Sequence, residues 1–357
     1  MTEQTVESII QRIEPVDESC AQQAREHISH LVIPPRALGR LHDMAEQLCG
    51  IQRTLTPDIT RKCVLVFAGD HGVVQEGVSA FPQVVSLEMI RCFLRGGGGI
   101  NAISKLVNAE VRVVDMGIVP DVNLEALEGG EHLTVSKIGK GTRNLAQGPA
   151  MSRQEAQASI LGGFHQAEKM IQSGVRLLGT GDMGIGNTTP SAAIGAVLTG
   201  QDLEGMVGRG TGIDDQGLKK KRQAIARGID LNRPDPEDGL DVLAKVGGFE
   251  IGGIAGCILA GAVYRVPVVI DGFISSAGAL IASRLCPRNT GFMFAGHCSE
   301  EPGHRAMLRS LGLEPILDLG MRLGEGTGGA LAMSVLDGAL RVFLEVMTFE
   351  QAGVSKA

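Results

Sequence analysis

Six short apolar runs recur along the chain, and each of them ends in a glycine-rich or polar turn. The runs are CVLVFAGDHG (63–72), VRVVDMG (111–117), VRLLGTGDMG (175–184), VPVVIDGF (266–273), GFMFAGH (291–297) and EPILDLG (314–320). Short aliphatic runs without polar alternation are typical of strands that are buried on both faces of a sheet. Helix-like segments separate the runs. An alternation of strands and helices predicts an α/β fold with a mostly parallel sheet flanked by helices, a Rossmann-like three-layer arrangement.

The segments between the runs have the residue patterns of helices. Helices are expected at residues 83–96, 153–174, 215–229, 249–264 and 327–347. The segment before the first run contains helical patterns broken by Pro15 and the Pro34-Pro35 pair, and it has no strand pattern. We therefore expect a small helical subdomain from residues 1–58 and about 327–357, and a large α/β domain over 59–326 that carries the active site.

Composition and charge exclude several classes of partner. A formal net charge of −7 argues against a surface that binds nucleic acid or an anionic membrane. The apolar run 251–264 has 14 residues, fewer than the roughly 20 that a membrane-spanning helix needs. The N-terminal segment lacks the apolar core of a signal peptide. The seven cysteines are scattered and form no CxxC pair, which favours a reducing compartment. We expect a cytoplasmic protein.

The glycine-rich turns are expected to converge on one edge of the sheet. Each turn follows a predicted strand, and ligands of parallel sheets bind beyond the carboxyl ends of the strands. The richest turn, GTGDMGIGNTTPSAAI (179–194), leads from a strand into a helix. Such a turn presents free backbone N–H groups to an anion. Its spacing matches neither the dinucleotide-binding GxGxxG pattern nor the P-loop, so the sequence predicts a phosphate or ribose site.

A second glycine-rich stretch, VGRGTGIDDQGLKKKR (207–222), repeats this theme. It precedes a helix that carries Lys219, Lys220 and Lys221. A lysine in this place could bind a phosphate as a point charge. A solvated basic helix face is the common alternative, and at most one of the three lysines is expected to turn inward.

Glu325 stands between two glycines directly before the last long helix, in LGMRLGEGTGGALAM (319–333). A carboxylate there is expected to have few local hydrogen bonds. Burial would raise its pKa and suit it to general-base catalysis near neutral pH. An ordinary acid at a helix N-terminus, favoured by the helix dipole, is the alternative.

Two further stretches, AGDHG (68–72) and GHCSEEPGHR (296–305), leave open a metal-dependent phosphohydrolase. Histidines and carboxylates at strand ends can form such a site, and the residues concerned are Asp70, His71, His297, Glu300, Glu301 and His304. No HxH or HExxH pairing occurs in these stretches. Hydrogen-bonded loop histidines are the favoured interpretation, and we predict no metal site.

Taken together, the motifs of this sequence resemble one enzyme family, the nicotinate-nucleotide–dimethylbenzimidazole phosphoribosyltransferases. The resemblance runs in order over nearly the full chain, through PPRALGRLHDMAEQL, AGDHGV, GNTTPSAAI, DVLAKVGGFEI, IDGFISSAGAL and MRLGEGTGGALAM. It implies transfer of the 5-phosphoribosyl group of nicotinate mononucleotide to a ring nitrogen of 5,6-dimethylbenzimidazole, in assembly of the lower ligand of cobalamin. It also implies a homodimer and no metal or redox cofactor.

The resemblance further implies roles for individual residues. The catalytic glutamate of the family falls on Glu325, and a second acid falls on Asp182, whose side chain is one carbon shorter than the usual glutamate. The nucleotide-side positions are Gly184, Asn187, Thr188, Gly210, Lys221 and Ser299. The base-side positions are Ser79, Phe81, Gln83, Met89 and Leu323.

The base pocket departs from the family at two of these positions. Phe81 stands where some members have a small polar residue, and Met89 where some have Gln. A more apolar pocket is expected, so the preference among benzimidazoles, purine-like bases and phenols could shift. A nucleotide-binding regulatory module that kept the fold and lost the chemistry is the non-enzymatic alternative, and an intact Glu325 argues against it.

Overall fold

A six-stranded sheet, all of whose pairings are parallel, forms the centre of the computed structural model, which describes residues 4–122 and 127–355. The strands are β1 (Lys62–Gly69), β2 (Ala109–Gly117), β3 (Leu133–Val135), β4 (Leu177–Met183), β5 (Val268–Ile270) and β6 (Met293–Ala295). Their order in the sheet is β3-β2-β1-β4-β5-β6. In the central strand β1, Val66 pairs with Val113 on one side and Gly181 on the other. The predicted α/β fold with a parallel sheet is confirmed.

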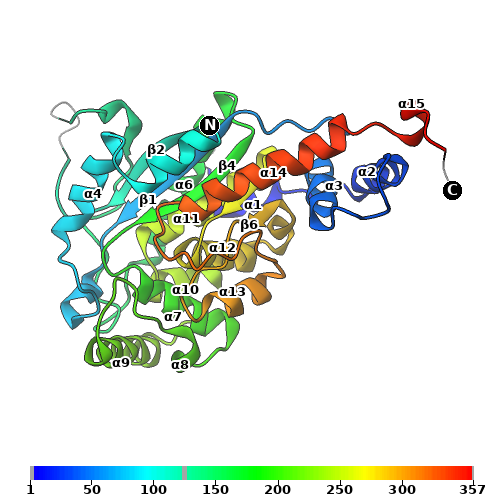
Figure 1. The fold of residues 1–357 in the computed structure, drawn as a ribbon. Coiled ribbons are helices and arrows are strands. Elements are labelled where there is room, and N and C mark those ends of the chain that lie inside the picture. Colours follow the sequence, from blue (N-terminus) through cyan, green and yellow to red (C-terminus); the bar gives the residue numbers. More distant parts are fainter. Residues whose placement is uncertain (1–3, 123–126, 356–357) are drawn as a thin grey trace.

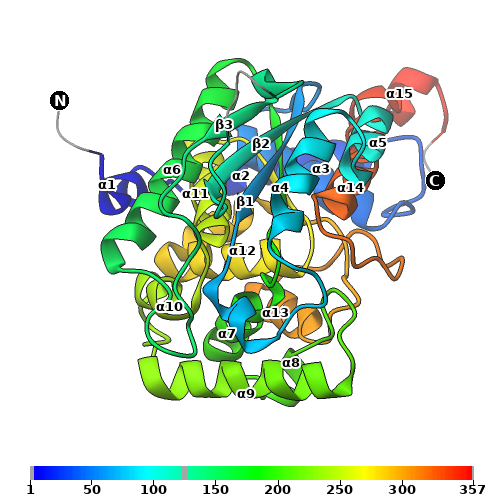
Figure 2. The same cartoon turned by 90° about the vertical axis from the view of Figure 1, so that its left-hand side faces the viewer.

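Helices cover both faces of the sheet, as Figure 2 shows. One face is covered by α6 (Arg153–Gln172), α11 (Phe249–Tyr264) and α12 (Phe273–Leu285). The other face is covered by α4 (Val84–Leu94), α5 (Gly99–Leu106) and α14 (Thr327–Glu345). This arrangement buries every residue of β1 and explains why its sequence is almost continuously apolar. The five helices predicted from the sequence are all present.

Five of the six predicted strands are confirmed, and the prediction of a strand at 314–320 is wrong. That segment pairs with the end of β6 only briefly: Ile316 donates its N–H to Ala295 at 2.8 Å, and an isolated bridge joins Leu317 and His297 beyond the strand. Pro315 has no backbone N–H to donate, so the pairing does not extend toward the start of the segment. The sixth strand is instead β3, a three-residue edge strand that pairs with β2. Its sequence, LTV, is too short to be recognised as an apolar run.

The helices of the two chain ends lie partly together. Figure 1 shows α2 (Glu18–His30) and α3 (Arg40–Gln52) beside the far end of α14 and α15 (Phe349–Ala352), away from the sheet. A bridge between Leu31 and Thr348 joins them. By contrast, α1 (Val6–Gln11) packs on α6 and α11. The division into 1–58 plus 327–357 and 59–326 stays a prediction, and its residues 1–3 and 356–357 lie outside the described part.

One helix in the described part of the chain, α14, is long and apolar enough to cross a membrane. It packs on α3, α5 and the central strands β4 and β5, and 56% of its most apolar window is buried. These contacts account for its composition as a helix of the protein core.

The remaining helices lie beyond the carboxyl edge of the sheet. They are α7 (Thr188–Thr199), α8 (Leu203–Met206), α9 (Asp215–Asn232), α10 (Gly239–Val246) and α13 (His304–Leu311). Figure 2 shows α9 lying across this end of the molecule.

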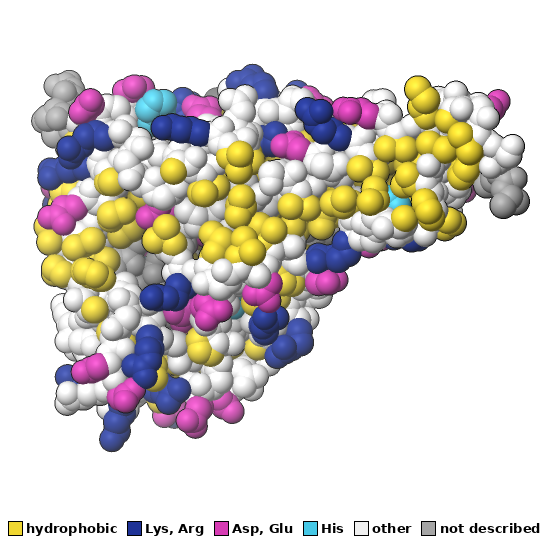
Figure 3. Space-filling view, in the orientation of Figure 1, with side chains coloured by type: hydrophobic (Ala, Val, Ile, Leu, Met, Phe, Trp, Pro, Cys, Tyr) yellow, Lys and Arg dark blue, Asp and Glu magenta, His cyan; other side chains and the backbone are white. Residues whose placement is uncertain are grey.

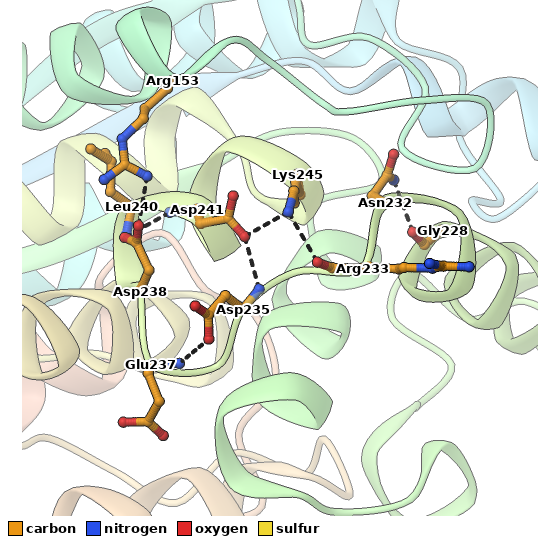
Figure 4. Close-up of polar contacts among 10 residues, drawn as sticks. All are labelled: Arg153, Gly228, Asn232, Arg233, Asp235, Glu237, Asp238, Leu240, Asp241 and Lys245. Carbon is orange, nitrogen blue, oxygen red and sulfur yellow. Dashed lines mark hydrogen bonds and ion pairs between the residues drawn. The ribbon is translucent and has the colours of Figure 1, made fainter.

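A polar network holds α9 in place at its junction with α10 (Figure 4). Asp238 caps α10 by accepting the backbone N–H groups of its first turn, and Arg153 of α6 pairs with the same carboxylate at 2.7 Å. Lys245 donates to the backbone oxygen of Arg233, which ends α9, at 3.0 Å, and to Asp241 at 2.8 Å. The end of α9 is thereby tied to α10 and, through it, to α6.

Candidate active site

A cavity of about 260 Å³ lies at the carboxyl edge of the sheet. The segments that follow β4, β5 and β6 meet there, as the sequence predicts for a parallel sheet. The cavity is lined by Phe81, Asp182, Asn187, Thr188, Gly210, Thr211, Gly272, Phe273, Ile274, His297, Ser299, Glu301, Arg322, Leu323 and Gly324. A larger depression of about 460 Å³ beside α4 contains none of the predicted site residues.

Seven of the thirteen predicted site residues line this cavity. They are Phe81, Asp182, Asn187, Thr188, Gly210, Ser299 and Leu323. The other six lie behind or beside its wall: Ser79, Gln83, Met89, Gly184, Lys221 and Glu325. The loops from distant parts of the sequence therefore do assemble into one site, but not every predicted residue reaches its surface.

Lys221 lies directly behind the cavity wall. Its ammonium group donates to the hydroxyl of Thr188 at 2.8 Å and to the backbone oxygen of Gly208 at 3.0 Å. It is fully buried, whereas Lys219 and Lys220 are exposed, so one lysine of the three turns inward as expected. Burial lowers the pKa of Lys221 to about 8, and the nearby carboxylate of Glu301 opposes this shift.

The start of α7 adds one backbone donor to the same corner. Thr189 already donates its N–H to the backbone oxygen of Gly186 at 3.0 Å, and Pro190 has no N–H, so the backbone N–H of Thr188 is the one that the first turn can offer. Gly210 closes this corner with a left-handed backbone, φ +54°. A Cβ at Gly210 would lie 2.7 Å from the hydroxyl of Thr188 and 3.3 Å from the ammonium of Lys221. A backbone N–H at a helix start, a hydroxyl and a buried ammonium group together suit a phosphate.

Asp182, the penultimate residue of β4, lines the cavity and accepts a hydrogen bond from Asn187 at 2.9 Å. Burial raises the pKa of Asp182 well above its usual value, and the charge of Asp271 adds to this shift. The neutral form, which can donate a hydrogen bond, is thereby favoured. Gly324 approaches closely, since a Cβ at that position would lie 3.2 Å from both carboxyl oxygens of Asp182.

Glu325 is buried, but it is not the unpartnered carboxylate that the sequence suggested. One carboxylate oxygen accepts the backbone N–H of Ile100 at 3.0 Å, and the N–H of Gly99 also contributes, both at the start of α5. Burial raises the pKa of Glu325, while these N–H groups oppose the shift. The partners are not local, since α5 is distant in sequence; the expectation of an unpaired carboxylate is wrong because α5 presents its N-terminus to this side chain.

The backbone at Glu325 is unusual for a residue with a side chain. Gly324, Glu325 and Gly326 all have positive φ, at +82°, +63° and +92°. A left-handed glutamate is disfavoured and persists where neighbouring structure holds it. Asp271 helps to hold it, since its carboxylate accepts the N–H groups of Gly326 at 3.2 Å and Gly329 at 2.8 Å. Glu325 directly follows Gly324 in the chain, and both Leu323 and Gly324 line the cavity.

The predicted base-side residues divide into two groups. Phe81 and Leu323 line the cavity and remain largely exposed, at 51% and 60%. Ser79 lies 3.3 Å from the hydroxyl of Thr211, and Gln83 donates to the backbone oxygen of His71 at 2.9 Å. Met89 packs, partly buried, against the core. Of the predicted base-side residues, Phe81 and Leu323 therefore offer apolar surface to the cavity.

Several residues of the cavity wall were not predicted as site residues from the sequence. They are Thr211, Gly272, Phe273, Ile274, Arg322 and Gly324. Gly272 and Phe273 close a predicted strand and could have been found as residues at a strand's carboxyl end. His297 and Glu301 were considered only as metal ligands. Glu301 accepts the N–H of Gly210 at 3.0 Å, and its other oxygen, buried in the cavity wall, makes no hydrogen bond.

The residues of the metallohydrolase alternative are engaged in separate contacts. His71 pairs with the buried carboxylate of Glu250 at 2.9 Å. His304 lies 2.8 Å from the hydroxyl of Ser276 and accepts the N–H of Ser299 at 2.7 Å. Within residues 4–122 and 127–355, no group of three or more His, Cys, Asp or Glu side chains is arranged to hold a metal ion.

The parallel sheet, the polar corner at Thr188 and Lys221, and the buried carboxyl groups beside it suit an enzyme that acts on a phosphorylated sugar. Residues 13–354 match the sequence model of a protein family described as Phosphoribosyltransferase. The protein is therefore a phosphoribosyltransferase by class.

Individual relatives narrow this class. The chain is 50% identical over 350 residues to nicotinate-nucleotide–dimethylbenzimidazole phosphoribosyltransferase of Geobacter sp. (strain M21), covering 98% of this chain and 99% of that one. It is 51% identical over 348 residues to the enzyme of the same name from Desulforudis audaxviator, covering 98% and 97%. A crystal structure of such an enzyme from Thermus thermophilus has a TM-score of 0.89 at 45% identity, covering 96% of this chain and all of that one. The chain belongs to the nicotinate-nucleotide–dimethylbenzimidazole phosphoribosyltransferase family.

Proposed function

We propose that this protein transfers the 5-phosphoribosyl group of nicotinate mononucleotide to 5,6-dimethylbenzimidazole or a related base, in assembly of the lower ligand of cobalamin. The observation that carries the proposal is one cavity whose wall joins Thr188, backed by the ammonium group of Lys221, to Asp182, Phe81 and Leu323. We expect the phosphorylated sugar at the polar end, beside Thr188, and the flat heterocycle at the apolar end, beside Phe81 and Leu323. The names of the relatives supply the identity of the substrates.

The proposed reaction is a displacement at C1′ of the ribose. A ring nitrogen of the base forms a bond to C1′ while the bond from C1′ to the nicotinate nitrogen breaks. Nicotinate leaves with the electron pair of that bond, and the N–H proton of the base passes to a carboxylate. The configuration at C1′ inverts, so the product is the α-ribotide and free nicotinate. This balance requires no metal or redox cofactor.

The residues of the polar corner are assigned to the nucleotide. The 5′-phosphate is expected to accept hydrogen bonds from the backbone N–H and the hydroxyl of Thr188, at the start of α7, with the charge of Lys221 behind it. Gly210 leaves room for this approach, since a Cβ there would lie 2.7 Å from the hydroxyl of Thr188. Gly184 has a different part, because a Cβ there would lie 2.1 Å from the backbone oxygen of Gly69, so its lack of a side chain lets the nucleotide-side loop pack against the end of β1. Ser299 and the carboxyl group of Asp182 are assigned to hydroxyl groups of the ribose.

The residues of the apolar end are assigned to the base. Phe81 and Leu323 are expected to pack on the two faces of the heterocycle. Glu325 follows Leu323 and Gly324 in the chain and is assigned the N–H proton of the base. The N–H groups of Gly99 and Ile100 stabilise the carboxylate before the base arrives. Catalytic hydrogen bonds are often completed only when substrate is bound. We therefore expect Glu325 to turn toward the cavity on base binding.

The assembly and the compartment belong to the same proposal. We assign the protein to the cytoplasm because all seven cysteines are free, five of them buried. We assign it to a homodimer because several large apolar side chains outside the cavity remain exposed, among them Leu319, Leu344 and Met347. Figure 3 shows hydrophobic side chains in a band that runs over α14 to α15. Burial of such a band against a second copy would remove it from water.

The experiment is a direct assay of the purified protein. It is incubated with nicotinate mononucleotide and a panel of benzimidazoles, purines and phenols, and chromatography follows free nicotinate and the ribotide product. We expect nicotinate release to depend on the base and to be unaffected by EDTA. Release of inorganic phosphate that stops with EDTA would favour the phosphohydrolase instead. Binding of nucleotide without any turnover would favour a regulatory module.

A further inference from the structure

Ser86 occupies a junction between the two ends of the cavity. It lies in the first turn of α4, directly after the loop that carries Ser79, Phe81 and Gln83, and it is fully buried. Its hydroxyl donates to the carboxylate of Asp70 at 2.6 Å and accepts the backbone N–H of Ile185 at 3.2 Å. One side chain therefore connects the base-side helix to the nucleotide-side loop.

Asp70 is a rigid partner for this hydroxyl. It follows β1 directly and is fully buried. Its second carboxylate oxygen accepts the N–H of Val119 at 2.8 Å. Its own backbone N–H donates to Gly117 at 3.1 Å, and its backbone oxygen accepts the N–H of Thr142 at 2.9 Å. Asp70 is thus fixed to the carboxyl ends of β1 and β2.

The other partner, Ile185, belongs to the loop that forms the nucleotide corner. Its neighbour Gly186 has a left-handed backbone, φ +90°. The next residues are Asn187, which donates to Asp182, and Thr188, which accepts from Lys221. A displacement of Ile185 would therefore move residues at the phosphate corner and at the ribose.

The base-side loop, which carries Ser79, Phe81 and Gln83, has a second anchor just after the carboxyl end of β1. Gln83 donates to the backbone oxygen of His71 at 2.9 Å. This contact ties the loop to β1, but it does not reach the nucleotide loop. Of these two anchors, only the hydroxyl of Ser86 connects both loops, and this explains how a residue with no surface on the cavity could matter for the reaction.

We propose that Ser86 is a positioning residue, whose hydroxyl sets the distance between the bound base and C1′ of the nucleotide. The inference rests on the proposed function. Displacement at C1′ requires the two reacting atoms to be held at roughly 3–3.5 Å in line with the leaving group. Without the hydroxyl, the carboxylate of Asp70 and the N–H of Ile185 lose their buried partner. The base-side loop and the nucleotide loop would then settle independently.

The test compares Ser86→Ala and the graded variant Ser86→Cys, which keeps the shape of the side chain with a weaker donor. The matched control is Ser159→Ala, since Ser159 is equally buried but donates only to Ala156 in its own helix, α6. The readout is the ratio of kcat/KM for dimethylbenzimidazole to kcat/KM for unsubstituted benzimidazole. This ratio is independent of the fraction of active enzyme, so a partly misfolded sample leaves it unchanged.

We expect Ser86→Ala to lower kcat/KM for dimethylbenzimidazole by about 100-fold, as a 1 Å misplacement does, and to change the ratio by about 5-fold or more. Ser86→Cys is expected to lie between wild type and Ala, and it carries the test if the alanine variant does not fold. The control is expected to match wild type. If wild type is active and the ratio is unchanged in the Ser86 variants, the inference about Ser86 is overturned and the proposed function stands. Absence of wild-type turnover would overturn the proposed function and the inference with it.

Discussion

Three buried carboxyl groups, those of Asp182, Asp271 and Glu325, lie close together at the carboxyl edge of the sheet. Burial raises the pKa of each. Asp271 accepts the N–H groups at the start of α14, whereas Asp182 lines the cavity and Glu325 is held on α5. Groups with the same chemistry are thus given different tasks by their hydrogen-bond partners, as is usual where an active site needs both acid and base.

We predict that Glu325→Gln lowers kcat by about 10²–10⁴-fold, the range that general-base catalysis contributes. Only the ionised carboxylate accepts the proton. Since burial raises the pKa of Glu325, wild-type activity should fall with decreasing pH at a higher pH than for an ordinary glutamate. The measurement is a pH profile of kcat. Glu345→Gln, at an exposed position of α14, is the control, and wild-type turnover in Glu325→Gln would refute the assignment.

The second residue-scale prediction concerns Lys221. Burial lowers the pKa of Lys221 to about 8, so the charged form, which is proposed to bind phosphate, is lost as the pH rises through that value. We expect the KM for nicotinate mononucleotide to rise above about pH 8. Lys221→Met should raise this KM by about 10-fold or more at pH 7, because a charged hydrogen bond contributes roughly 1.5–3 kcal/mol. It should also abolish the pH dependence.

The control for this variant is Lys220→Met, since Lys220 is exposed on the same helix. The KM for the base should change little in either variant. Equal increases in both KM values for Lys221→Met would argue against a role at the phosphate.

At the scale of elements, the crossing of α6 and α11 depends on glycines. A Cβ at Gly163 would lie 1.9 Å from the backbone oxygen of Gly253, and a Cβ at Gly256 would lie 1.9 Å from that of Ile160. The two helices therefore touch through their backbones. This contact brings α11 close against β1, β2 and β4, and it places Glu250, at the start of α11, beside His71.

We predict that Gly256→Ala lowers the free energy of unfolding by at least about 1–3 kcal/mol, because the added methyl group overlaps backbone atoms that cannot move aside. Gly338→Ala is the matched comparison, since it lies inside α14 with no atom within 4 Å of the new Cβ. That substitution should stabilise by about 0.5–1 kcal/mol through helix propensity. Thermal and urea unfolding would measure both. A Gly256→Ala protein as stable as wild type would contradict this packing.

At the scale of the whole molecule, the proposed homodimer has a direct test. A dimer would have twice the chain mass of 37.5 kDa, measurable by light scattering after size-exclusion chromatography. We expect the double variant Leu344→Glu, Met347→Glu to shift the protein toward monomer, because charges would be buried in an apolar interface. Leu231→Glu, exposed on α9, should have no effect. A monomeric wild type at all concentrations would contradict the proposal.

The sequence by itself determined the alternation of buried strands and helices, the edge at which the glycine-rich turns meet, and the family. These features depend on local periodicity and on motifs that stay contiguous in the chain, as in β1 and the turn after β4. It could not show that α5 presents its N-terminus to Glu325, that Ser86 joins two loops, or that the run at 314–320 stays outside the sheet. Each of these depends on which distant backbone groups come together, because hydrogen bonds and burial are properties of neighbours in space rather than along the chain.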